Sequence, residues 1–160
     1  MDTSLIYIFN NNNNNFIFSN VLNNNNGTIM CLNATNKNKV VASLNYIVYN
    51  NSIFIEKITV EPEYKRCKLG SIMVTLLEQS AKQKNINQID GYMNNMTHSE
   101  RDLNYVMART KFYVSLGYKI TKEKSLKQIY TFSKTNNEFL NLQQLELLKL
   151  LKVKSLSHKK

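Results

Sequence analysis

The chain has 160 residues, which suits one domain, because domains commonly contain about 100 to 150 residues. Its hydrophobic content of 42% is enough for a folded core, and no apolar run approaches the roughly 20 residues that span a bilayer. The formal net charge is +10, from 21 basic and 11 acidic residues, which favours phosphates, acidic partners or nucleic acid without choosing among them.

The cysteines and histidines give no sign of a metal site. Cys31 and Cys67 form neither a disulfide framework nor a Cys/His cluster, and the two histidines are far apart in sequence. We therefore expect no metal and a reducing compartment. A cytoplasmic location is expected, with the nucleus as an alternative.

The N-terminal segment, residues 1–27, is rich in asparagine. Short apolar patches at residues 5–9 and 16–18 indicate strands. The runs at residues 10–15 and 23–26 are predicted to be loops, because asparagine side chains do not suit a core.

The next part of the chain is strand-like. Asn50 and Asn51 separate two of its strands and predict a tight hairpin, because asparagine tolerates a positive φ. Pro62 is predicted to end the last of them. The predicted strands are residues 28–33, 40–49 and 52–60.

Helices and strands then alternate. Residues 70–84 have an apolar stripe at helical spacing, with Glu78, Gln79 and Lys82 on the side expected to face solvent. Thr97 and Glu100 fit a capping box for a second helix, which Gly117 closes. The remaining predicted elements are strands at residues 86–93 and 128–133 and a final helix at residues 138–152.

This order predicts a mixed α/β (α+β) fold, with helices flanking a partly antiparallel sheet. We expect a single domain in three parts: the N-terminal segment 1–27, a core at 28–134, and a C-terminal helix with a basic tail at 135–160. The broad apolar arc of the last helix is predicted to dock on its own domain, with a homodimer contact as the alternative.

One stretch predicts chemistry. A strand ends near Val60, a basic turn with Lys65, Arg66 and Lys68 follows, and a helix begins at Gly70. The first N–H groups of a helix lack intrahelical partners and carry partial positive charge, so this turn is a candidate phosphate site. A solvated strand-to-helix turn is the alternative.

Two motifs in order resemble the GNAT family of N-acetyltransferases. Val60, Pro62, Lys65 and Gly70 match the spacing of the family's V-x-P-x-x-[RQ]-x-x-G-x-[GA] segment, and residues 112–118, FYVSLGY, resemble its F-Y-x-x-x-G-[FY] segment. The chain departs from the family pattern at four points. Lys65 replaces the commoner arginine or glutamine, and Lys68 replaces a loop glycine. Val106 stands where an asparagine is usual, and the N-terminus lacks the usual helices.

The resemblance implies a GNAT-like fold and acetyl-coenzyme A as the acyl donor. It implies that the thioester and pantetheine lie along the strand end and that the turn cradles the pyrophosphate. The implied cofactor-binding residues are Thr59, Val60, Lys65, Arg66, Cys67, Lys68, Leu69, Gly70 and Ser71. Tyr113 matches the family's proton donor to the departing sulfur, although it would also suit a core aromatic.

Glu56 is the candidate general base. Strict strand alternation would place it on one face with Ile58 and Val60, although a surface glutamate paired with a lysine is an equal alternative. Asp90 and Tyr92 are weaker candidates.

The sequence therefore predicts an N-acetyltransferase that acts on a primary amine of a protein or small molecule. One alternative is a catalytically degenerate acyl-coenzyme A-binding or scaffold protein of the same fold. The other is a basic nucleic-acid-binding module, which the dispersed charge disfavours.

Overall fold

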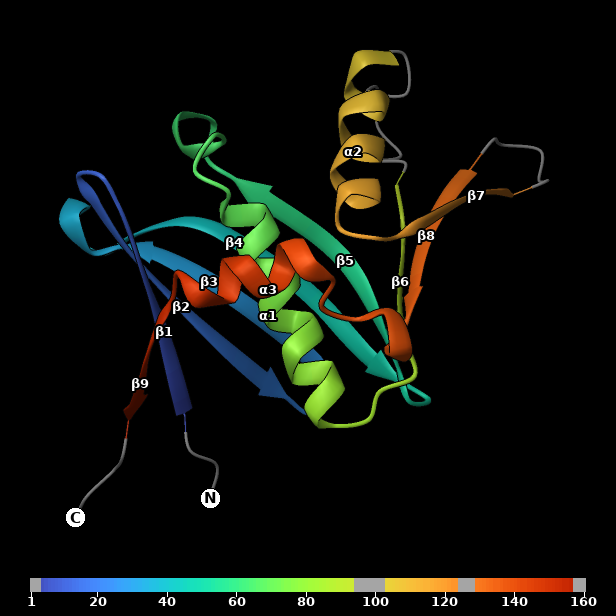
Figure 1. The fold of residues 1–160 in the computed structure, drawn as a ribbon, viewed down its shortest axis with the longest axis horizontal. Helices are drawn as coiled ribbons and strands as arrows, with labels where there is room; N and C mark the ends of the chain where they lie inside the picture. Colours follow the sequence, from blue (N-terminus) through green and yellow to red (C-terminus); the bar gives the residue numbers. More distant parts are fainter. Residues whose placement is uncertain (1–3, 94–102, 124–128, 157–160) are drawn as a thin grey trace.

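The computed structural model describes residues 4–93, 103–123 and 129–156. Its centre is one nine-stranded sheet in the order β7-β8-β6-β5-β4-β3-β2-β1-β9 (Figure 1). Every strand pair is antiparallel except β5 and β6, which run parallel. The predicted fold class, a mostly antiparallel sheet flanked by helices, is confirmed.

The elements follow the chain with short connections. The strands are β1 (Ser4–Asn11), β2 (Asn14–Asn23), β3 (Asn26–Asn33), β4 (Lys39–Tyr49), β5 (Ser52–Val60), β6 (Gln88–Tyr92), β7 (Lys119–Glu123), β8 (Ile129–Thr135) and β9 (Lys152–Leu156). The helices are α1 (Leu69–Gln83), α2 (Leu103–Ser115) and α3 (Leu142–Lys149), with short 3-10 turns that include η1 (Ala34–Asn36), η2 (Pro62–Tyr64) and η4 (Asn136–Glu138).

The asparagine runs are not the loops that the sequence predicts. Most of residues 10–15 and 23–26 belong to strands, and each run contains only a two-residue turn. Asn12, Asn24, Asn50 and Asn51 all have φ between 49° and 61°. Asparagine enters this left-handed region more readily than most residues, so it forms the hairpin turns in a chain with few glycines. The hairpin predicted at Asn50-Asn51 is confirmed.

One face of the sheet packs against α1, and α3 packs against α1 in turn. The core joins large side chains of the sheet to the inner side of α1, namely Phe16, Phe18, Ile29, Leu44, Ile53, Ile55, Ile72, Met73, Leu76 and Leu77. Within the described ranges, no helix has both the length and the apolar content needed to span a bilayer.

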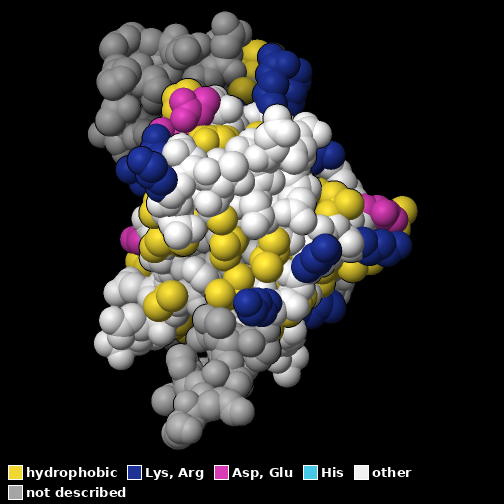
Figure 2. Space-filling model, turned by 90° about the vertical axis from the view of Figure 1, so that its left-hand side faces the viewer, with side chains coloured by type: hydrophobic (Ala, Val, Ile, Leu, Met, Phe, Trp, Pro, Cys, Tyr) yellow, Lys and Arg dark blue, Asp and Glu magenta, His cyan; other side chains and the backbone are white. Residues whose placement is uncertain are grey.

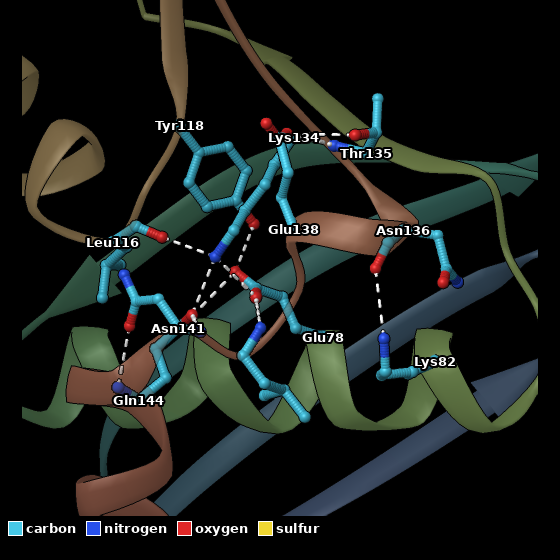
Figure 3. Close-up of polar contacts among 11 residues, drawn as sticks. Glu78, Lys82, Leu116, Tyr118, Lys134, Thr135, Asn136, Glu138, Asn141 and Gln144 are labelled. Atoms are coloured by element: carbon cyan, nitrogen blue, oxygen red, sulfur yellow. Dashed lines mark hydrogen bonds and ion pairs between the residues drawn. The ribbon is translucent and has the colours of Figure 1, made fainter.

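The prediction for Glu78 is wrong. Its side chain is fully buried and pairs with Lys134 at 2.9 Å, rather than facing solvent (Figure 3). The sequence pattern of α1 assigns one buried side to the helix, whereas α1 is covered by the sheet on one side and by α3 on another.

The C-terminal segment also differs from its prediction. The final helix is shorter than expected, and the chain continues into β9, which pairs antiparallel with β1. Leu147 of α3 is buried, which agrees with docking on the same domain, whereas Leu142 is 76% exposed. A homodimer contact through this helix remains a prediction. The capping box predicted at Thr97 and Glu100 lies outside the described residues.

Candidate active site

The site begins where β5 and β6 diverge. The two strands pair from Ser52 opposite Gln88 to Ile55 opposite Gly91. Beyond Ile55, β5 continues to Val60 beside β4 alone. Within the part of the chain that the structure describes, no strand pairs with the other edge of residues 56–60, so this edge is open to a ligand.

A β-bulge in β5 changes the orientation of its side chains. Ile55 pairs with Tyr46 and Lys57 pairs with Asn45, which leaves Glu56 as an additional residue. The strict alternation predicted from Glu56 onward is therefore broken. Glu56 is exposed and does not line the cavity described below. Its role as a base remains a prediction.

The turn after β5 is fixed by a buried tyrosine. Tyr64 in η2 is 9% exposed, and its hydroxyl accepts a hydrogen bond from Asn33 Nδ2 at 3.0 Å. Its ring meets Phe16 edge-on, with the centroids 5.7 Å apart. These contacts tie the basic turn to the core, while the side chains of Lys65 and Arg66 stay exposed.

Lys68 has a backbone conformation that glycine adopts more easily than lysine. It is the N-cap residue and has φ 65° and ψ 19°, in the left-handed region. Lysine adopts this conformation at a cost of about 1 kcal/mol, so the turn keeps its shape without the glycine. No side chain caps α1 in the described structure, so the first N–H groups of the helix face the turn.

Helix α2 forms the opposite wall. Phe112 lies against Gly70, where an added Cβ would stand 3.3 Å from Cε1 of the ring. Because Gly70 has no side chain, α1 and α2 can approach each other closely at this point.

Arg109 lies one turn before Tyr113 in α2. It donates from a guanidinium nitrogen to the carbonyl oxygen of Met93 at 3.0 Å.

These elements enclose a cavity of about 540 Å³. It runs from the basic turn and the start of α1 to the aromatic end of α2. Its lining is Ile58, Val60, Lys65, Arg66, Lys68, Gly70, Ser71, Ala108, Arg109, Phe112 and Tyr113.

Most of the predicted cofactor residues lie in this lining, and three do not. Thr59 is exposed, Cys67 is half-buried against the core, and Leu69 is 1% exposed within the core. Arg109 belongs to the lining but was not predicted. Its spacing of four residues from Tyr113 would have placed both on one face of a helix.

Tyr113 is held by other aromatic rings. It is 2% exposed and stacks on Phe132 with the centroids 3.8 Å apart. Phe112 and Tyr118 meet it edge-on, at centroid distances of 4.9 and 5.7 Å. The ring therefore has a defined position at the inner end of the cavity.

Where the structure describes the chain, the lining carries lysine and arginine side chains but no aspartate or glutamate. Together with the start of α1, these cations suit a ligand with several phosphate charges. Among the described residues, histidine, cysteine, aspartate and glutamate do not gather in threes as metal ligands would.

A family model described as "Acetyltransferase (GNAT) family" matches residues 5–102, more than half of the chain. The protein therefore belongs to the GNAT family of acetyltransferases. No curated protein sequence matches it significantly.

Solved structures of the family have the same fold. The PaiA N-acetyltransferase of Thermoplasma acidophilum, in complex with coenzyme A, superposes with a TM-score of 0.54 at 16% identity, over 69% of this chain and 61% of the other. A GNAT acetyltransferase of Staphylococcus aureus gives 0.55 at 18% identity, over 69% and 68%. An aminoglycoside 6'-N-acetyltransferase complexed with coenzyme A gives 0.53 at 16% identity, over 71% and 74%.

Proposed function

We propose that the protein transfers an acetyl group from acetyl-coenzyme A to a primary amine of a protein or small molecule. The observation that carries the proposal is that one continuous cavity joins the cationic start of α1 to Tyr113 along the edge of β5 that no described strand covers. Family membership and the coenzyme A-bound relatives support the same donor.

The basic end of the cavity would hold the diphosphate of the donor. Lys65, Arg66 and Lys68 supply charge, and the N–H groups at Gly70 and Ser71 supply directed donors. The pantetheine arm would follow β5 toward Tyr113, because backbone groups on the edge of β5 that have no partner among the described residues can bond to its amides.

Transfer joins the amine nitrogen to the thioester carbonyl carbon and breaks the bond between that carbon and sulfur. The carbonyl oxygen carries negative charge in the intermediate, which backbone N–H groups on the open edge of β5 can stabilise. The attacking nitrogen loses a proton, and the departing thiolate gains one. The products are the acetylated amine and coenzyme A.

Tyr113 is suited to protonate the thiolate. A tyrosine phenol carries its proton at neutral pH and can donate it to sulfur. Glu56 is the proposed general base. It would accept the proton that leaves the amine, directly or through water, because it lies on β5 beside the open edge.

The test combines binding and turnover. Thermal unfolding is followed with acetyl-coenzyme A and with coenzyme A, and release of the free thiol is measured with an N-terminal peptide, a lysine peptide and a small diamine. Tyr113→Phe should retain the thermal shift and lose roughly 10²- to 10⁴-fold in kcat. Tyr49→Phe is the matched control, because Tyr49 is 69% exposed and lies outside the cavity.

Other results would support the alternatives. Stabilisation by both ligands without turnover on any amine would indicate a catalytically degenerate binding protein. No stabilisation, together with salt-sensitive binding of DNA, would indicate a nucleic-acid-binding module. Against the latter, Figure 2 shows lysine and arginine side chains in several separate groups rather than one continuous stripe.

A further inference from the structure

Glu78 and Lys134 form the centre of a buried polar network (Figure 3). Both are at most 1% exposed, and Lys134 Nζ lies 2.9 Å from Glu78 Oε1. The ammonium also donates to Leu116 O at 2.6 Å and to Gln144 Oε1 at 2.7 Å. Its three N–H groups therefore all have acceptors.

The carboxylate of Glu78 is equally well satisfied. Tyr118 donates its hydroxyl proton to Oε2 at 2.9 Å, and Gln144 Nε2 donates to the same oxygen at 2.8 Å. The backbone N–H of Leu140 donates to Oε1 at 2.8 Å. The network thus joins α1, β8, the end of α2 and the start of α3.

Two routes lead from this network to Tyr113. Lys134 holds Leu116 O just beyond the last residue of α2, and the carbonyl of Tyr113 accepts bonds from the N–H groups of Leu116 and Tyr118 at 3.1 and 3.0 Å. Through the rings, Tyr118 meets both Tyr113 and Phe132 edge-on. The helix end and the aromatic stack are therefore anchored at one point.

A buried ion pair is a weak source of stability, because desolvation offsets most of the attraction between its charges. Its directed bonds do fix geometry. Helix α2 extends beyond the sheet in Figure 1, and the network holds the end of the helix that contains Tyr113. A fixed end also contributes to the width of the cavity between α2 and α1.

We propose that Glu78 and Lys134 are positioning residues for acetyl transfer, which hold Tyr113 in place through Tyr118 and the end of α2. The inference rests on the proposed function, because it assigns the network a role in the same reaction. Neither residue lines the cavity, so neither is a catalytic residue.

The test uses the double variant Glu78→Gln with Lys134→Met, which removes both charges and leaves neither one unpaired. Its kcat should fall roughly ten- to a hundred-fold, because small displacements of a reacting group cost that much, while the KM for acetyl-coenzyme A stays within about twofold. Lys82→Met is the matched control. Lys82 lies one turn further along α1 and bonds only to Asn136 O in the described structure, at 3.3 Å (Figure 3).

A second measurement reports on Tyr113 directly. With 3-fluorotyrosine at position 113 alone, the double variant should move the fluorine resonance, and Lys82→Met should not. A parental kcat or a parental resonance in the folded double variant would overturn the proposal. If the double variant does not fold, Tyr118→Phe is measured in its place. A parental kcat or a parental resonance in Tyr118→Phe would then overturn the proposal. Absence of turnover in the parent would remove the proposed function, whereas the fluorine signal would still decide whether the ion pair positions Tyr113.

Discussion

The rings of Tyr113 and Phe132 lie nearly parallel, with their centroids 3.8 Å apart and their planes inclined by 14°. Phe132 in turn lies over its cross-strand neighbour Gly91, and its ring occupies the space where a side chain at position 91 would stand. A glycine in β6 therefore determines where the ring that supports Tyr113 can lie.

Gly91→Ala should displace Phe132 and, through it, Tyr113. We expect the free energy of unfolding to fall by about 1–3 kcal/mol, as for other overpacked cores, and acetyl transfer to slow more than the loss of folded protein explains. Gly27→Ala is the matched control, because the ring of Tyr46 covers Gly27 in the same way and lies outside the cavity. Urea unfolding and initial rates measure both effects. Equal effects on the rate in the two variants would contradict the role of Phe132.

Lys68→Gly should separate backbone strain from charge. Glycine removes the strain that lysine has in the left-handed conformation. It also raises the conformational entropy of the unfolded chain, which opposes folding, so the net gain in stability should be below about 1 kcal/mol. Loss of the cation should weaken coenzyme A binding about three- to tenfold and lessen its dependence on salt.

Lys37→Gly is the control for the backbone effect. Lys37 has φ 54°, close to the 65° of Lys68, and does not line the cavity. It should show the gain in stability without the change in coenzyme A affinity, both measured by thermal unfolding and calorimetric titration. An unchanged affinity in Lys68→Gly would mean that this lysine does not contact the phosphates.

Local signals in the sequence predict much of the fold and one side of the site. Asn50 and Asn51 predict a hairpin because both residues must have positive φ, and Pro62 ends β5 because it has no N–H to donate. The turn and the start of α1 follow from the same kind of local chemistry. These features depend on a few neighbouring residues.

The features that the sequence does not predict depend on distant residues. Glu78 resembles a surface residue until Lys134, 56 positions away, is placed beside it. The bulge at Glu56 depends on the register of β4, which no pattern within β5 reveals. Strand β9 is polar and short, and it forms because β1 offers an edge.

The two cysteines should differ sharply in reactivity. Burial raises the pKa of Cys31 to about 12, with a smaller contribution from nearby Cys67. Since the thiolate is the form that attacks thiol reagents, Cys67→Ser protein should react slowly between pH 7 and 9, whereas Cys31→Ser protein, with the half-buried Cys67 alone, should react faster. An Ellman assay in buffer and in urea measures this. Equal rates in the folded variants would contradict the burial of Cys31.

Tyr118 should make the protein sensitive to alkali. Burial, followed by the negative charge and hydrogen bond of Glu78, raises the pKa of Tyr118 well above its usual value. Below about pH 10 the folded and unfolded states both keep the phenolic proton, so its stabilising contribution is complete. Above that pH the unfolded state loses the proton first, and the free energy of unfolding falls by up to about 1.4 kcal/mol per pH unit for one such group.

Tyr118→Phe should lower the free energy of unfolding at pH 7 by about 1–3 kcal/mol, because Glu78 loses a hydrogen-bond donor. Above pH 10, the free energy of unfolding should fall less steeply with pH in this variant than in the parent. The pKa values of Tyr7 and Tyr46 are also raised by burial, so some decline remains. Urea unfolding at half-unit steps from pH 8 to 11 gives both slopes, with Tyr49→Phe as the exposed control. Parallel slopes for the parent and Tyr118→Phe would mean that the Tyr118 phenol titrates alike in the folded and unfolded states, which contradicts its burial against Glu78.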